Sequence, residues 1–199
     1  RFRMEKPEMI IFDYGRTLIY QPNYNISNGN KAIYPYIDRN PHNISFEEYD
    51  RSNLELFAKI KAERGKYLEI HENNFLRLFF DYMDISLSIS LEEAEIIIMN
   101  GISQGAVMPY ADIMLDYLNA KGIRTGVISN NCFSGAALKE QFDRLLPGNR
   151  FEFVLASSDY IFRKPHSIMY EIALQKSGLT ADKVWYCGDS MEDDIYGAN

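Results

Sequence analysis

The stretch Met9-Ile10-Ile11-Phe12-Asp13 decides the fold of this chain. Its four apolar residues follow one another without alternation, which is typical of a parallel strand buried on both faces. A carboxylate placed where such a strand ends points into the crevice in which open α/β sheets bind their ligands. We therefore expect Asp13 to lie at the functional edge of a parallel sheet. A second acid two positions later could serve as its proton-transfer partner, but that position is Gly15.

Length, charge and cysteine usage narrow the class of protein. With 199 residues, of which 46% are hydrophobic, the chain can bury one substantial core, or one core and a smaller module. The net charge is −7 and no basic run occurs, so we expect no nucleic-acid partner. No apolar stretch approaches the ~20 residues that span a bilayer, so we expect no membrane partner. Oligomeric state is left open.

The two cysteines, Cys132 and Cys187, are too few for a disulfide framework and lack metal-ligand spacing. We take both as small packing residues. A reduced, cytoplasmic protein is therefore expected.

The segment after the first strand differs in character from the rest of the chain. Residues 21–43 are rich in Asn, Tyr and Pro, which predicts loop and turn. Residues 45–103 have a helical pattern throughout, with capping boxes predicted at Ser45 and Ser90 and a helix end at Gly65. No strand signal occurs there, so we expect a helical insert with its own small core.

Strands and helices alternate from about residue 108 onward. Strands are predicted at 125–129, 151–156 and 184–188, and helices at 110–121, 134–145 and 166–177. This alternation indicates an α/β fold with a doubly wound, Rossmann-like parallel sheet. We expect residues 1–20 and 108–199 to form a discontinuous α/β core and residues 21–107 to form a helical cap. Because such a sheet normally continues with a further helix and strand, we expect the native chain to continue past Asn199.

Polar groups follow each predicted strand, and parallel strands bring their carboxyl ends together. Asp13 follows the first strand, Ser129 ends the second, Lys164 comes after the third, and an acidic cluster from Asp189 to Asp194 follows the fourth. A carboxylate, a hydroxyl, an ammonium group and further acids at one edge suit phosphoryl transfer, in which phosphate charge must be neutralised before attack. We expect the substrate to be a small phosphorylated metabolite.

Each of these groups has a plausible part in binding a phosphate and a metal. Lys164 supplies a compact positive charge. The Ser129 hydroxyl and the backbone N–H groups of Asn130 and Asn131 could hold phosphate oxygens. Asp13 and Asp189 could share Mg²⁺, which prefers hard oxygen ligands.

The four segments resemble the motifs of the haloacid dehalogenase-like (HAD) superfamily in order and spacing. The first is Asp13-Tyr14-Gly15-Arg16-Thr17, the second is Ser129, the third is Lys164 in Arg-Lys-Pro, and the fourth runs from Gly188-Asp189 to Asp194 with a trailing Gly197-Ala198. The helical insert resembles the C1-type cap of subfamily I. The match spans nearly the whole chain.

The resemblance implies a Mg²⁺-dependent phosphohydrolase that forms an aspartyl-phosphate at Asp13. The catalytic residues that it implies are Asp13 and Lys164. The residues implied to bind the substrate phosphate are Ser129, Asn130 and Lys164. The implied metal ligands are Asp13, Gly15 through its backbone carbonyl, Asp189 and Asp194.

Gly15 departs from the family pattern, since most members carry a general acid/base Asp at that position. General acid–base help is typically worth ~10²–10⁴-fold, and its loss matters most for poor leaving groups. Three readings stay open. The protein is a slow or specialised phosphatase, a dehalogenase- or phosphonatase-like hydrolase on the same scaffold, or a catalytically silent protein that binds phosphorylated ligands.

Other charged residues near these motifs have simpler explanations. Arg16 could add positive charge near the phosphate, but an exposed loop Arg paired with a surface acid is the commoner case. A phosphonatase would need a Schiff-base Lys from the cap, yet a solvated helix face accounts for Lys59, Lys61 and Lys66. For His166, a surface or helix-start role is more common than catalysis.

Overall fold

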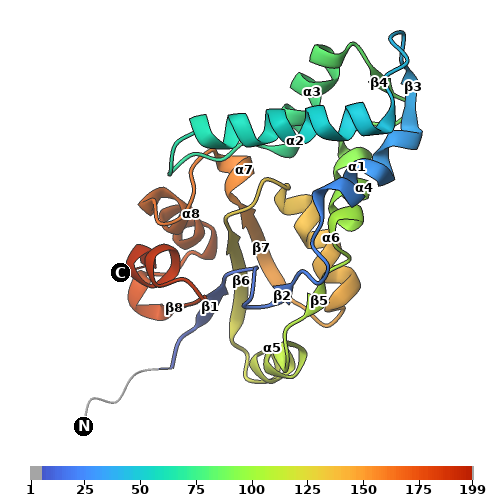
Figure 1. Cartoon of the computed structure of the whole chain (residues 1–199). Coiled ribbons are helices and arrows are strands. Elements are labelled where there is room, and N and C mark those ends of the chain that lie inside the picture. The colour runs from blue at the N-terminus through green and yellow to red at the C-terminus, as the bar shows by residue number, and fades with distance from the viewer. Residues whose placement is uncertain (1–5, 199) are drawn as a thin grey trace.

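The central sheet of the computed structural model, which describes residues 6–198, has four parallel strands in the order β7-β6-β1-β8 (Figure 1). The strands are β1 Met9–Phe12, β6 Arg124–Ser129, β7 Phe151–Ala156 and β8 Val184–Cys187. Phe12, the last residue of β1, pairs with Val127 of β6 and Cys187 of β8. The predicted parallel sheet is confirmed, and its carboxyl ends meet beyond Phe12.

Helices cover both faces of this sheet. Helices α5 (Ala111–Ala120) and α6 (Gly135–Leu145) contribute Leu115 and Phe142 to the same buried cluster as Phe12 and Val127. On the other face, α8 (Ser167–Ser177) packs Met169 and Ala173 against Met9, Ile11 and Ile128. The short helix α7 (Ser157–Tyr160) follows β7 directly. Two-sided coverage explains why β1 is apolar without alternation.

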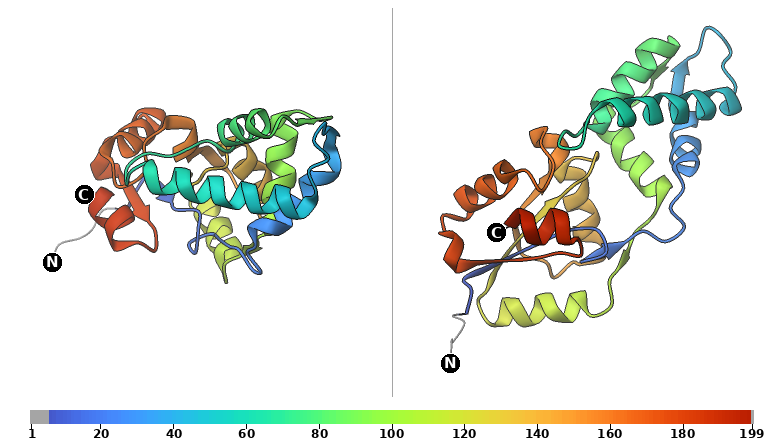
Figure 2. Two further views of the ribbon diagram at one scale, coloured as in Figure 1. Left: turned by 45° about the horizontal axis from the view of Figure 1, so that its top comes forward. Right: turned by 60° about the vertical axis from the view of Figure 1, so that its left-hand side comes forward.

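Four α-helices lie in the segment 21–105, between the first strand of the sheet and α5. They are α1 Ile26–Ile33, α2 Phe46–Glu63, α3 Glu72–Met83 and α4 Leu91–Ile102. Two short antiparallel strands flank them in the chain: β2 (Ile19–Tyr20) precedes α1 and β5 (Ala106–Val107) follows α4. Figure 2 shows these helices to one side of the sheet, with α2 reaching back over its edge. The division into a core, residues 1–20 and 108–199, and a cap, residues 21–107, is our proposal.

Two predictions for this insert are wrong. Helix α1 occupies part of the predicted loop 21–43: Asn25 caps it, and a 3₁₀ turn, η1 (Tyr34–Tyr36), follows. Few apolar side chains mark this helix because it packs through glycine. A Cβ at Gly29 would lie 2.7 Å from Ile102, so only glycine allows α1 to approach α4 this closely. A pair of short antiparallel strands, β3 (Ile37–Arg39) and β4 (Ser86–Leu87), also lies where we expected no strand.

Most of the predicted helix ends are confirmed. Ser90 forms both bonds of a capping box with Glu93, whereas Ser45 forms one half, accepting from the backbone N–H of Glu48. Gly65 follows α2 with a φ of 77°. A 3₁₀ turn, η2 (Ala181–Lys183), precedes β8, and a π-helical turn, η3 (Met191–Tyr196), follows it. In the part of the chain that the structure describes, no helix is both long and apolar enough to cross a membrane.

Candidate active site

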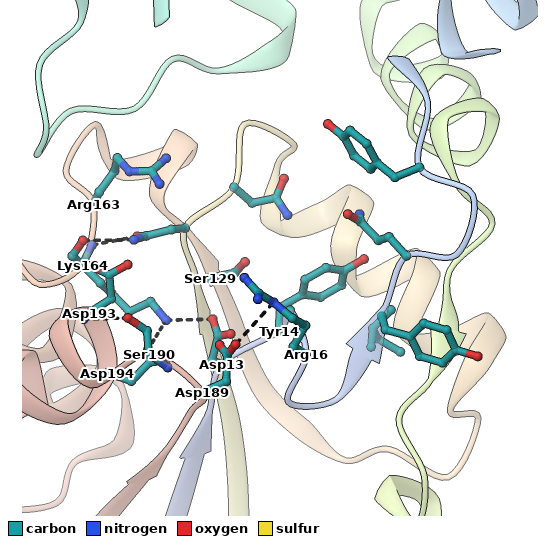
Figure 3. Close-up of a pocket in the computed structure, with 17 residues that line it drawn as sticks. Asp13, Tyr14, Arg16, Ser129, Arg163, Lys164, Asp189, Ser190, Asp193 and Asp194 are labelled. Atoms are coloured by element: carbon teal, nitrogen blue, oxygen red, sulfur yellow. Dashed lines mark hydrogen bonds and ion pairs between the residues drawn. The ribbon is translucent and has the colours of Figure 1, made fainter. Parts of the chain in front are cut away.

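A cavity of about 520 Å³ lies at the carboxyl edge of the sheet (Figure 3). Asp13 follows β1, Ser129 ends β6, and Asp189 follows β8. Three strands therefore place a polar side chain at the same edge of the sheet. Lys164 arrives from the loop between α7 and α8. All the sequence-predicted site residues line this cavity: Asp13, Gly15, Ser129, Asn130, Lys164, Asp189 and Asp194.

The Lys164 ammonium group is the centre of a buried ion cluster. Its Nζ lies 2.7 Å from Oδ1 of Asp13 and 2.6 Å from Oδ1 of Asp194. The Lys164 side chain is 2% exposed and that of Asp194 1% exposed. Nζ also donates to the hydroxyl of Tyr186, at 2.9 Å. Three acceptors surround the three protons of the ammonium group, so the lysine is fixed in position.

Burial and charge act against each other on Asp13. Burial raises the pKa of the Asp13 carboxyl, the charge and hydrogen bond of Lys164 lower it, and the charge of Asp194 raises it again. Burial, with the charges of Asp13 and Asp194, holds the pKa of Tyr186 well above its usual value. The phenol of Tyr186 therefore stays neutral, accepting from Lys164 and donating to the carbonyl of Ile128.

Asn130 holds Lys164 through its side chain. The Asn130 carboxamide accepts from the backbone N–H of Lys164 at 2.7 Å and donates to its carbonyl at 3.0 Å. The expectation that the Asn131 N–H holds phosphate is wrong for this structure, because that N–H donates to the Ser157 hydroxyl at 3.0 Å.

The acidic segment after β8 turns back on itself. Asp194 accepts from the backbone N–H of Ser190 at 2.9 Å, and Ser190 caps η3. A Cβ at Gly188 would lie 2.2 Å from the Asp194 carboxylate, so this turn requires glycine. A single π-helical turn is common at functional sites, and here it aims Asp194 at Lys164.

Three carboxylates could hold a divalent cation. Asp13, Asp189 and Asp194 each offer one oxygen, and these oxygens all lie within 4.8 Å of one another. Such a set of hard anionic oxygens fits Mg²⁺, which prefers oxygen ligands and retains several waters. In the structure Lys164 and Arg16 balance these charges, since Arg16 Nε lies 3.3 Å from Oδ2 of Asp189.

Gly15 lies on the cavity wall without a side chain. A Cβ built there would have no neighbour within 4 Å, and its φ is outside the left-handed region that only glycine favours. An acid at this position would therefore fit. Gly15 thus leaves the position without an ionisable side chain, although there is room for one.

A family model described as haloacid dehalogenase-like hydrolase matches residues 26–199. The chain belongs to this family. Among its curated relatives is a glyceraldehyde 3-phosphate phosphatase of Methanocaldococcus jannaschii, 26% identical over 94% of this chain and 78% of the relative. A glyceraldehyde 3-phosphate phosphatase of Methanothermobacter thermautotrophicus is 28% identical over 72% of this chain and 62% of its own length.

Solved structures of this hydrolase family share the fold. A HAD phosphatase from Thermococcus onnurineus superposes with a TM-score of 0.59 at 19% identity, covering 96% of this chain and 80% of its own. A 2-haloacid dehalogenase from Pseudomonas syringae pv. Tomato reaches 0.57, also at 19% identity, covering 96% and 81%. Both a phosphatase and a dehalogenase are thus similar in fold to this hydrolase. The fold alone therefore does not tell which of the two reactions it catalyses.

Two contacts of this hydrolase site were missed from the sequence. Tyr186 was predicted as part of a strand, and only the order of the sheet shows that it reaches Lys164. Arg16 does pair with an acid, as expected for a loop arginine, but its partner Asp189 is a candidate metal ligand. A positive φ of 57° at Arg16 turns the side chain toward the site, and no residue pattern signals it.

Proposed function

We propose that the protein is a Mg²⁺-dependent phosphatase that acts on a small phosphorylated metabolite through an aspartyl-phosphate at Asp13. The observation that carries this proposal is the buried Asp13–Lys164–Asp194 cluster, with Asp189 beside it, on the wall of a 520 Å³ cavity. Curated relatives named as phosphatases support the reaction class. A cytoplasmic location remains a prediction from cysteine usage.

Asp13 is the nucleophile in this proposal. Lys164 holds Oδ1, so we assign the attack to Oδ2 of the same carboxylate. A bond forms between Oδ2 and phosphorus while the phosphorus–ester oxygen bond breaks, and the electron pair leaves with that oxygen. Because no acid stands at Gly15, the leaving oxygen takes its proton from water.

Water completes the cycle. Its oxygen attacks the phosphorus of the aspartyl-phosphate, the bond to Oδ2 breaks, and the Asp13 carboxylate is restored as inorganic phosphate leaves. A positioned base is usually worth ~10²–10⁴-fold in such a step. We therefore expect slow turnover for substrates whose leaving group is a simple alcohol.

Lys164 and Arg16 supply part of the positive charge that the site needs. We assign the phosphate oxygens to Lys164, the Ser129 hydroxyl and the backbone N–H of Asn130. The Asn130 side chain keeps the Lys164 backbone in place. A Mg²⁺ ion would be held by Asp13, Asp189, Asp194 and the Gly15 carbonyl. When bound, it supplies positive charge that screens Asp13 from the phosphate and stabilises the charge developing on it.

Hydrolysis of a phenyl phosphate, measured with Mg²⁺ and with a chelator, tests the proposal. An aryl leaving group needs little protonation, so activity is expected without an acid at position 15. It should disappear with the chelator and in Asp13→Asn. Release of halide from a 2-haloacid without metal would instead identify a dehalogenase, and tight phosphate binding without any turnover would identify a silent ligand-binding protein.

A further inference from the structure

A second cavity, of about 480 Å³, shares a wall with the catalytic cavity. The wall that the two have in common is formed by Asn130, Arg163, Lys164 and Asp193. The opposite side belongs to the end of α2 and the segment after it, where Lys61, Arg64 and Lys66 point to the same space. A ligand that extends from the phosphate site can therefore pass from the sheet edge toward α2.

This second cavity is lined by more cationic than acidic side chains, in a chain whose net charge is −7. Five of its lining side chains are cationic, namely Lys61, Arg64, Lys66, Arg163 and Lys164, and two are acidic, Glu192 and Asp193. A third acid, Glu69, lies behind Arg163 and pairs with it. Lys164 is already neutralised by Asp13 and Asp194 and is left out of the balance. The other four cations then exceed the three acids by one.

The cations differ in how far they are already paired. Lys66 pairs with Glu192, and Arg163 with Glu69. Lys61 forms no ion pair with any residue from 6 to 198, although it lines the cavity. The sequence had given Lys61 and Lys66 no role beyond a solvated helix face, and the fold places both beside the catalytic cavity.

The segment that carries these cations is fixed against the site. Arg64 donates to the backbone carbonyls of Gly65 and Leu68, the first at 3.0 Å. The Glu69 N–H donates to the Ile161 carbonyl at 2.6 Å, and the Arg163 N–H to the Tyr67 carbonyl at 2.8 Å. These backbone bonds join the segment after α2 to the loop that presents Lys164, so the two cavities keep a defined spacing.

We infer that the second cavity binds a second anionic group of the substrate, a carboxylate or another phosphate, with Lys61 and Lys66 determining this preference. The inference rests on the proposed function, because it names the substrate class of the same site. A compound such as glyceraldehyde 3-phosphate, with one phosphate and no other ionised group, leaves these cations unused. A substrate with two anions gains an ion pair with them and binds with higher specificity.

The test compares substrates that differ in one charge. The value of kcat/KM is measured for 3-(carboxymethyl)phenyl phosphate, for its neutral carboxamide, and for phenylene 1,3-bisphosphate. The anionic compounds should be preferred over the carboxamide. Because each ion pair at a partly exposed site contributes modestly, this preference should fall about threefold in Lys61→Gln and about tenfold in Lys61→Gln/Lys66→Gln. A higher kcat/KM for the carboxymethyl compound than for the bisphosphate would indicate that the second cavity binds a carboxylate, and the reverse order would indicate a phosphate.

Lys59→Gln is the matched control, because Lys59 is exposed on the same helix and does not line the cavity. The Lys59→Gln variant should prefer the anionic compounds over the carboxamide as strongly as the native protein does. Added salt should reduce the preference of the native protein and leave that of Lys61→Gln/Lys66→Gln nearly unchanged. An unchanged preference in both lysine variants, with all three compounds hydrolysed, would overturn the inference and leave the phosphatase intact.

Calorimetry separates the inference from the proposed function. The dissociation constants of the carboxylate and carboxamide compounds are measured with Asp13→Asn, in which hydrolysis is not expected. Tighter binding of the carboxylate, lost on adding Lys61→Gln, supports the second site even if the native protein hydrolyses neither compound. Equal binding of the two compounds refutes the second site whether or not the native protein is a phosphatase.

Discussion

The ammonium group of Lys164 lies 2.7 Å from Oδ1 of Asp13, although the two residues are 151 positions apart in the chain. Both side chains are largely buried, and Asp194 shares the same ammonium group. Removing one member of a buried ion cluster leaves an uncompensated charge, which typically costs about 3–5 kcal/mol. The cluster therefore links the stability of the sheet edge to the chemistry proposed there.

Lys164→Met is expected to lower both stability and activity. Without metal, Asp13 and Asp194 would face each other without a cation, and the free energy of unfolding should fall by roughly 3 kcal/mol. The kcat/KM for phenyl phosphate should fall at least about 100-fold, because a charge that neutralises the phosphate is lost. Denaturant unfolding and steady-state kinetics check the two effects. Lys176→Met, exposed on α8, is the control, and equal losses in both variants would contradict this assignment.

Gly15→Asp should speed the hydrolysis of alkyl phosphates more than that of aryl phosphates. The position has open space for a Cβ, so the acid can be accommodated. If proton transfer limits turnover, the alkyl-to-aryl ratio of kcat/KM should rise about 100-fold. Gly15→Asn has nearly the same shape and no ionisable proton, so its ratio should stay at the native value. A rise in both variants would show that shape, not proton transfer, is responsible.

Arg16 is expected to compete with metal for Asp189. Its guanidinium lies 3.3 Å from the Asp189 carboxylate, and its side chain is 83% exposed, so the opposing charge is screened. In Arg16→Gln, the Mg²⁺ concentration for half-maximal activity should fall about threefold, whereas in Asp189→Asn it should rise strongly. Metal titrations of phenyl phosphate hydrolysis measure both. An unchanged Mg²⁺ requirement in Asp189→Asn would remove that residue from the metal site.

Glu72 gives the chain a pH-dependent stability. Burial and the nearby Glu95 raise the pKa of the Glu72 carboxyl to about 7, with Cys132 and His71 acting in the opposite direction. The folded state therefore holds this proton more tightly than the unfolded state does, and stability falls as pH rises from about 4.5 to about 7. The full shift corresponds to about 3 kcal/mol.

Denaturant unfolding of Glu72→Gln across that pH range checks this prediction. The fall in stability with rising pH should be smaller in this variant than in the native protein, whereas Glu171→Gln, exposed on α8, should keep the native fall. A Glu72→Gln variant whose stability falls with pH as steeply as that of the native protein would contradict the raised pKa.

The sequence predicted the parts of the fold that depend on short-range pattern. The run at 9–12, the strand at 151–156 and the end of the helix predicted at 166–177 appear as expected, because apolar runs and glycine caps act within a few residues. Helix α1 was missed because its burial depends on Gly29 approaching α4, a contact between segments about 70 positions apart in the chain. Long-range packing of this kind overrides local propensity.

In the candidate site too, the sequence predicted what depends on local pattern and missed what depends on long-range packing. Asp13, Lys164, Asp189 and Asp194 were placed correctly at one edge, because parallel strands must bring their carboxyl ends together. The partners that hold them were not foreseen. Tyr186 reaches Lys164 only because β8 lies next to β1, and Lys61 and Lys66 reach the cavity only because the end of α2 is bonded to the loop before Lys164.

Peptide mass spectrometry of enzyme acid-quenched during phenyl phosphate turnover tests the central claim most directly. An aspartyl-phosphate survives acid long enough for its added mass to be assigned to one peptide. We predict one phosphoryl group on the peptide that contains Asp13, and none in Asp13→Asn. Turnover by Asp13→Asn at the native rate, or a phosphoryl group carried by any other residue, would contradict the account.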